Sequence, residues 1–301
     1  MPWLLLAFAL VCGCAGTAPP PADWLAWKSR RLESVAGTNG WTTLIGLHWL
    51  EEGTNTAGSA TTQDIVVAAP RVPKTIGKFI RRGDAVRFVV APDILVRSGD
   101  IPVTDISLIT DRDPSPTVLE VGAARMQVIA RGDRLGVRIR SPEAPARRQF
   151  RGLQCFPYDP AWRIPARFEP YPTARTVRLP SVIGIPQEYV SPGRVLFPHA
   201  GREYALEAVI ELGESEYFIL FRDATAGSDT YASGRFLYVS QPDASGRTVV
   251  DFNRAYTPPC GFTAFATCPL PPPQNRLPFP IPAGERRPEA HPLDGTHVAN
   301  P

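Results

Sequence analysis

Two clusters of ionisable residues in the last third of the chain have the types and spacing that acid–base chemistry uses. The first lies in FRDATAGSDTYASGR and the second opens DFNRAYTPP. An arginine between two carboxylates can keep one ionised while burial raises the pKa of the other, and a tyrosine can act as proton donor. The candidate catalytic residues are Asp223, Tyr231, Arg235, Asp251, Asn253 and Arg254.

The same residue types also form purely structural networks. Aspartates cap turns, and an Arg–Asp pair can satisfy buried backbone groups. Because such networks are commoner than catalytic sites, we favour the structural interpretation and keep the catalytic one open. The chain has no GxSxG motif, which argues against a serine hydrolase of that type.

The N-terminus resembles an export signal. A short apolar run, Trp3 to Val11, is far below the roughly 20 residues of a membrane-spanning helix, and VCGCAG follows it. This order is similar to a bacterial lipobox with Cys14 as the lipidated residue. We therefore expect a cell-envelope protein anchored to a lipid bilayer, with a signal that is not lipidated as the alternative.

Export changes the expectation for the other cysteines. Cys155, Cys260 and Cys268 lie in the expected folded part, and an exported protein meets oxidising conditions. We expect a Cys260–Cys268 disulfide, worth about 2–3 kcal/mol in the chain-entropy model. A metal site is the less favoured alternative because the spacing matches no usual zinc motif. Cys155 is expected to be a buried, inert thiol.

The segment RRQFRGLQCFPYDPAWRIPARFEPY alternates arginines with aromatic residues. Arginines stacked on rings could bind an anionic or planar ligand. The same alternation suits a strap across two sheets, with rings buried and guanidinium groups reaching the solvent, and we favour the strap. The candidate ligand-binding residues are Arg151, Tyr158, Trp162 and Arg163.

Composition bounds the remaining functions. The 301 residues are 44% hydrophobic and 20% charged, which is enough to bury a sizeable core. The net charge is +3, and the basic residues are interleaved with acidic ones rather than clustered, so we expect no nucleic-acid partner. There is no glycine-rich phosphate loop, and we expect neither cofactor nor metal. The 34 prolines, against about 15 in a typical chain, indicate many turns and few long helices.

Periodicity predicts a mainly β fold. One N-terminal helix is expected in DWLAWKSRRLESV, capped by Asp23. FIRRGDAVRFVV and VIARGDRLGVRIR are predicted hairpins. The whole indicates two packed antiparallel β-sandwich or barrel-like units with a long ordered Pro-rich C-terminal loop. The expected division is 1–14 signal peptide, 15–22 linker, 23–146 N-terminal β domain, 147–287 C-terminal β domain with Pro-rich loop 251–275, and 288–301 disordered tail.

Several long motifs together resemble a known family. GLHWLEEGTNTAGS, FRGLQCFPYDPAWRIPARFEPY, FRDATAGSDTYASGRFLYV and DFNRAYTPPCGFTAFATCPLPPPQNRLPFPIPAGER occur in this order between Trp24 and Arg286. They are similar to the bacterial family catalogued as domain of unknown function 1684. The resemblance covers nearly the whole chain and implies no particular reaction or ligand.

A second, fold-level likeness concerns the N-terminal half. Gly53, Asn55, Gly58 and Ser59, followed by DIVV and GKFI, are similar to the core of forkhead-associated domains, which are β-sandwiches. The phosphothreonine-reading arginine and the structural histidine of those domains have no counterpart here, so we expect no phosphopeptide binding.

Two classes of function remain. The favoured one is an exported envelope lipoprotein with a binding or structural role, for which a small-molecule ligand fits. The alternative is a hydrolase-like enzyme with an Asp/Arg/Tyr site at the strand ends beside the Pro-rich loop. An open cleft lined by these side chains would favour the enzyme, and complete burial would argue against it.

Overall fold

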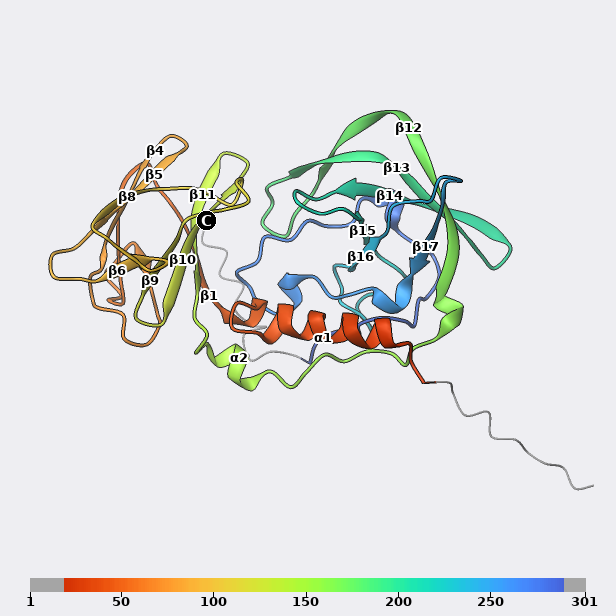
Figure 1. Cartoon of the computed structure of the whole chain (residues 1–301), viewed down its shortest axis with the longest axis horizontal. Helices are drawn as coiled ribbons and strands as arrows, with labels where there is room; N and C mark the ends of the chain where they lie inside the picture. The colour runs from red at the N-terminus through yellow and green to blue at the C-terminus, as the bar shows by residue number, and fades with distance from the viewer. Residues whose placement is uncertain (1–18, 290–301) are drawn as a thin grey trace, which may run out of the picture.

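The computed structural model of the protein describes residues 19–289. The expected signal, its lipidation site Cys14 and residues 290–301 of the expected tail lie outside the described residues. Within the described range no helix has the length and apolar character needed to cross a bilayer. The mainly β architecture with one N-terminal helix is confirmed, and the strands fall into three sheets (Figure 1).

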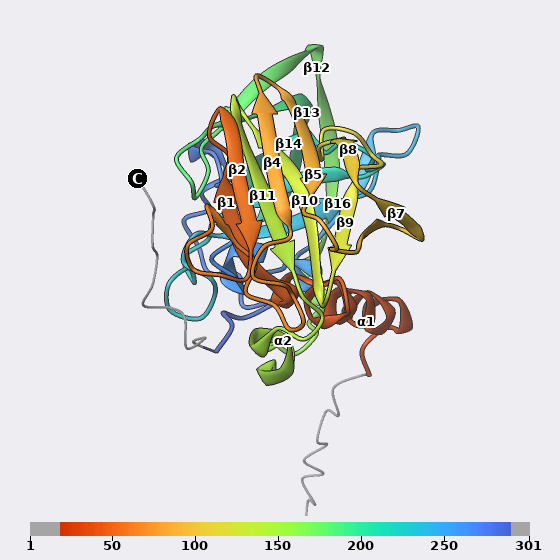
Figure 2. The same ribbon diagram turned by 90° about the vertical axis from the view of Figure 1, so that its left-hand side faces the viewer.

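Two of the sheets face each other and form an N-terminal sandwich. Its first sheet runs in the order β1 (Leu44–Trp49), β11 (Arg134–Arg140), β10 (Ala124–Arg131), β9 (Val118–Val121), β6 (Val96–Ser98) and β7 (Ile101–Val103). The second runs β3 (Ile65–Val66), β2 (Gly53–Gly58), β4 (Gly77–Arg82), β5 (Ala85–Val90) and β8 (Asp105–Leu108), and lies toward the viewer in Figure 2. Side chains from both sheets, including Phe79, Phe88, Met126 and Val137, form one buried core.

Both predicted hairpins are confirmed. Arg82 pairs with Ala85 in the first and Arg131 with Arg134 in the second, so each turn has two residues, glycine then aspartate. Gly83 and Gly132 have φ values of 58° and 59°, a region that costs a residue with a Cβ more than it costs glycine. The Gly-Asp pairs therefore fix the register of these two hairpins.

The third sheet makes up the C-terminal half of the molecule. Its order is β16 (Arg235–Val239), β15 (Tyr217–Phe221), β14 (Arg202–Ile210), β13 (Gln187–His199), β12 (Arg163–Leu179) and β17 (Arg247–Asp251). The two edge strands β16 and β17 contact each other, so the sheet curls into a half-barrel. One face buries a core around Phe197, Phe221 and Phe252, and the other a smaller core around Phe218 and Leu220.

The helix α1 (Ala22–Ala36) packs on the C-terminal half, although it precedes the N-terminal sandwich in sequence (Figure 1). Trp24 Nε1 donates a hydrogen bond to the carbonyl of Asn253, 2.9 Å away. The expected cap at Asp23 is wrong, because the N-cap position is Pro21 and Asp23 lies in the first turn. The buried face carries Arg31 beside Trp24 and Val35, and Leu32 is 43% exposed.

The connector and the Pro-rich C-terminal stretch complete the fold with short elements. These are η1 (Trp41–Thr43), α2 (Pro145–Gln149), η2 (Pro160–Trp162), η3 (Phe252–Arg254), η4 (Pro259–Gly261) and η5 (Pro273–Asn275). Backbone hydrogen bonds outside regular helices and strands hold the Pro-rich C-terminal stretch in place. Leu277 donates to the carbonyl of Arg222, and Phe279 accepts from the amide of Ala224. The predicted long, ordered loop is therefore present, laid against the half-barrel.

Candidate functional site

The loop between β15 and β16 folds around one buried aspartate. The Asp223 carboxylate accepts hydrogen bonds from the backbone and the hydroxyl of Thr225, at 3.2 and 2.6 Å. The Thr225 carbonyl in turn accepts the amides of Ser228, Asp229 and Thr230, which closes the loop into a compact turn. Aspartate and threonine suit this role because their short side chains bond to nearby backbone.

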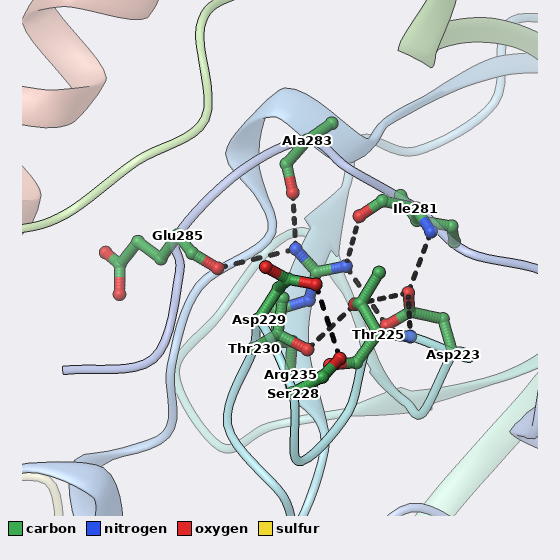
Figure 3. A network of polar contacts seen from close by, with 9 residues as sticks. All are labelled: Asp223, Thr225, Ser228, Asp229, Thr230, Arg235, Ile281, Ala283 and Glu285. Carbon is green, nitrogen blue, oxygen red and sulfur yellow. Dashed lines mark hydrogen bonds and ion pairs between the residues drawn. The ribbon is translucent and has the colours of Figure 1, made fainter.

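Arg235, at the start of β16, is fully buried and lies against this aspartate (Figure 3). Its Nη2 is 3.1 Å from Asp223 Oδ1, with side-chain exposures of 0% and 2%. The same guanidinium donates to the carbonyls of Ile281, Ala283 and Glu285. Burial lowers the pKa of Arg235, and the Asp223 charge opposes this effect.

The stretch at residues 277–283, which crosses over Arg235 and is called the crossing stretch below, explains why an arginine is needed there. Residues 277–283 read LPFPIPA, so every second residue is a proline without an N–H donor. Such a segment exposes more backbone acceptors than donors, and buried carbonyls need partners. Arg235 supplies several donors from one planar group, and Asp223 balances its charge and accepts the Ile281 amide at 2.8 Å. The Asp223–Arg235 pair therefore serves the fold.

The second cluster of candidates contacts the first turn of α1. Asn253 donates to the Asp159 carbonyl and accepts the Asp159 amide, both at 2.9 Å. Arg254 lies between Asp251, 3.5 Å away, and Asp23 at the start of the helix. Within residues 19–289 no hydrogen bond or ion pair joins this cluster to Asp223 or Arg235. The two carboxylates that were to share one site therefore belong to separate networks.

A cavity of about 760 Å³ lies beside the first cluster and is the candidate functional site. Loop 227–232, turn 260–265 and segment 286–289 form most of its wall, joined by Leu44, Ala146 and Gln154. Phe262 and Phe265 give it aromatic surface. Asp229 and Arg286, also in the wall, pair at 3.1 Å and are each about half exposed. The wall thus combines apolar and polar surface and carries little net charge.

Tyr231 is the one catalytic candidate that lines this cavity. Its hydroxyl donates to the carbonyl of Cys260 at 3.2 Å. Burial raises the pKa of Tyr231 above its ordinary value, so the phenol stays protonated and keeps this hydrogen bond. Asp223, Arg235, Asp251, Asn253 and Arg254 are absent from the wall.

The expected Cys260–Cys268 disulfide is wrong, because both thiols are free in the structure. The Cys260 amide donates to Cys268 Sγ at 3.1 Å, so the η4 turn uses the second sulfur as a hydrogen-bond acceptor. Hydrogen bonds from the Cys268 thiol and from Tyr231 lower the pKa of Cys260, against the effect of burial. Burial raises the pKa of Cys155 to about 11 and also raises that of Cys268. Cys260 is the thiol in the cavity wall.

The alternative metal site finds no support in the arrangement of side chains. Nowhere in residues 19–289 do three histidine, cysteine or carboxylate side chains gather as metal ligands would. His199, which stands alone after a strand in the sequence, stacks on Trp162 and Phe279 at centroid distances of 5.5 and 4.0 Å.

The candidate ligand-binding residues of the connector lie away from the cavity wall. The rings of Tyr158 and Trp24 pack edge to face, with centroids 5.7 Å apart, and Trp162 packs on Phe252. Arg163 is exposed and lies 3.8 Å from Asp251, and Arg151 is exposed. The rings therefore pack the strap onto α1 and the half-barrel core.

Sequence reasoning missed most of the wall, including Phe262, Phe265 and Arg286. It also missed Glu285, which is 1% exposed and binds Arg31 of α1 at 2.8 Å. Only the loop composition GFTAF, with two aromatic rings beside small residues, could have drawn attention to the wall. The pairing of residues 31 and 285 has no local signal, since 254 positions separate them.

Comparison with known proteins gives a family without an assigned activity. Residues 148–286 match the model of the family described as protein of unknown function (DUF1684). These residues include the strap, the half-barrel and most of the cavity wall.

Among solved structures, the chain is similar to the solution NMR structure of an uncharacterized protein from Haloarcula marismortui. The identity is 32%, the match covers 48% of this chain and 82% of that one, and the TM-score is 0.40. No curated protein matches the chain.

Proposed function

We propose that the protein binds a small, partly apolar molecule in the cavity beside loop 227–232. The observation that carries this proposal is the cavity itself, whose volume of about 760 Å³ lies in the range of small-molecule sites. Aromatic rings can cover an apolar body, and the Asp229–Arg286 pair can orient polar groups. Because these two charges offset each other, a ligand with little net charge suits the site.

The hydrolase-like alternative is less well supported. Asp223 and Arg235 are buried under the crossing stretch and already bonded to backbone groups, so no substrate reaches them. Asp251 and Arg254 hold the start of α1 instead. The relationship of the sandwich to forkhead-associated domains stays a prediction about fold, and we propose no phosphopeptide binding from it.

Alkylation of Cys260, the thiol in the cavity wall, provides a readout for ligand binding. In the native protein, iodoacetamide should alkylate Cys260 before Cys155 or Cys268, because thiolate reacts and only the pKa of Cys260 is lowered. Small molecules that raise the melting temperature should slow this alkylation. Peptide mapping by mass spectrometry measures the rate at each cysteine.

Ala232→Trp should fill the cavity and abolish both the stabilisation and the slower alkylation. Ala85→Trp, at an exposed position of β5 in the sandwich, should leave both unchanged. Ligands that stabilise Ala232→Trp as much as the wild type would refute binding in this cavity.

The setting proposed for this binding protein is the cell envelope. The support is the short apolar run followed by VCGCAG, in which Cys14 has the position of a lipidated cysteine. In a bacterial host, Cys14→Ser should abolish incorporation of a fatty-acid analogue, and Cys12→Ser should retain it. Unchanged labelling of the Cys14 variant would show that no lipid anchor forms there.

A further inference from the structure

A second hollow, of about 510 Å³, is lined by residues of the first sandwich sheet. This sheet is the one that lies next to the C-terminal half (Figure 1). We call it the arginine groove. Its polar wall consists of Asn39, Glu120, Arg125, Gln127, Arg138 and Arg140. No residue of the groove lines the cavity beside loop 227–232, so the two sites are distinct.

Strand alternation places these arginines on one face. Leu135, Val137 and Ile139 of β11 enter the sandwich core, so Arg138 and Arg140 point the other way. In register, Arg138 lies opposite Gln127 of β10, and Arg140 lies opposite Arg125. Three guanidinium groups therefore gather on two neighbouring strands.

The positive charge of the groove is not balanced within the described residues. Arg125 pairs with Glu120 at 2.9 Å. No carboxylate of residues 19–289 lies within ion-pair distance of Arg138 or Arg140. Arg140 instead donates to the carbonyls of Asn39 and Gly40, at 2.9 and 3.0 Å. The groove thus holds two positive charges without a counter-charge.

Arg138 is the less satisfied of the two. It is only 7% exposed, its Nη2 has one long hydrogen bond of 3.3 Å to Thr267, and its Nε has no partner among the described residues. A buried charge without a partner destabilises a fold. Burial, reinforced by the charges of Arg131 and Arg140, lowers its pKa to about 10, so it remains charged at neutral pH. The ring of Trp41 lies near both guanidinium groups.

We propose that the arginine groove binds a soluble phosphate monoester, whose oxygens take the free donors of Arg138 and Arg140. A phosphate monoester carries close to two negative charges at neutral pH, which matches the two unbalanced arginines. Its oxygens accept several hydrogen bonds from guanidinium forks. A ligand of this class also removes the electrostatic penalty of Arg138, so its binding stabilises the fold.

The test uses inorganic phosphate and glycerol 3-phosphate as probes, with NaCl at equal ionic strength as reference. Both should raise the melting temperature of the wild type, and Arg138→Met should weaken their apparent affinity by about tenfold or more. The matched control is Arg134→Met, on the same strand and face, whose guanidinium stacks on Trp49 outside the groove. That variant should respond as the wild type does.

Without phosphate, Arg138→Met should be as stable as the wild type or more so, because the unpaired charge is gone. A second variant, Gln127→Glu, places a carboxylate opposite Arg138 and should raise stability while abolishing the phosphate response. The proposal is overturned if phosphate stabilises no more than NaCl, or stabilises Arg138→Met and Gln127→Glu as much as the wild type. A response to succinate alone, or to phosphatidic acid vesicles but not glycerol 3-phosphate, would also overturn it.

Discussion

Asp223→Ala is expected to lower the free energy of unfolding by about 3–5 kcal/mol, because it leaves the fully buried guanidinium of Arg235 without its counter-charge. The substitution also removes the acceptor of the Ile281 amide and of the Thr225 hydroxyl. The crossing stretch at residues 277–283 should therefore loosen before the rest of the half-barrel. Urea unfolding measures the loss, and limited proteolysis locates the loosened segment.

Asp229→Ala is the matched control for this prediction. Asp229 lies on the same loop and also pairs with an arginine, Arg286, but both side chains are about half exposed. An exposed pair contributes roughly 0–1 kcal/mol. If Asp223→Ala lowers the free energy of unfolding no more than Asp229→Ala does, the hydrogen bonds that Arg235 donates do not hold the Pro-rich stretch in place.

Glu285→Ala should be about as destabilising, by about 3–5 kcal/mol, for a related reason. The Glu285 carboxylate is 1% exposed and accepts from Arg31 Nε at 2.8 Å and from the Thr257 amide at 2.9 Å. Its removal leaves Arg31 charged and buried at 7% exposure. Since Arg31 is the central residue of the buried face of α1, the helix should detach, which amide hydrogen exchange of residues 22–36 can detect.

A double-mutant cycle separates this pair from general damage. Arg31→Ala and Glu285→Ala should be less than additive, with a coupling energy of roughly 0.5–3 kcal/mol. Arg30→Ala, one position along the helix and exposed, should have little effect. Full additivity of the two substitutions would mean that the ion pair does not hold the helix.

The parts of the fold that local rules govern could be predicted from the sequence. Gly83-Asp84 and Gly132-Asp133 are two-residue turns between paired strands, and both segments form hairpins as expected. The helix was also predictable, but the arginine on its buried face was not. Helical periodicity selects apolar residues, and the seam of α1 contains Arg31, whose partners lie in the last part of the chain.

Prediction of the site was limited by long-range packing. Asp223, Arg235, Asp251 and Arg254 have the types of a catalytic cluster, but sequence gives neither their burial nor their separation into two networks. The expected disulfide failed for a similar reason. Composition placed Cys260 and Cys268 near each other, whereas the details of the η4 turn made the second sulfur an acceptor for the Cys260 amide.

The contacts of α1 tie the start of the folded chain to its end. Trp24 reaches Asn253, and Arg31 reaches Thr257 and Glu285, over separations of 229, 226 and 254 residues. Contacts between such distant positions form late, because a long loop must close first. During synthesis, therefore, the charge of Arg31 lacks its carboxylate partner until Glu285 has been made. A chain shortened before Glu285 would leave Arg31 buried without its counter-charge, so completion of the fold depends on an intact C-terminal stretch.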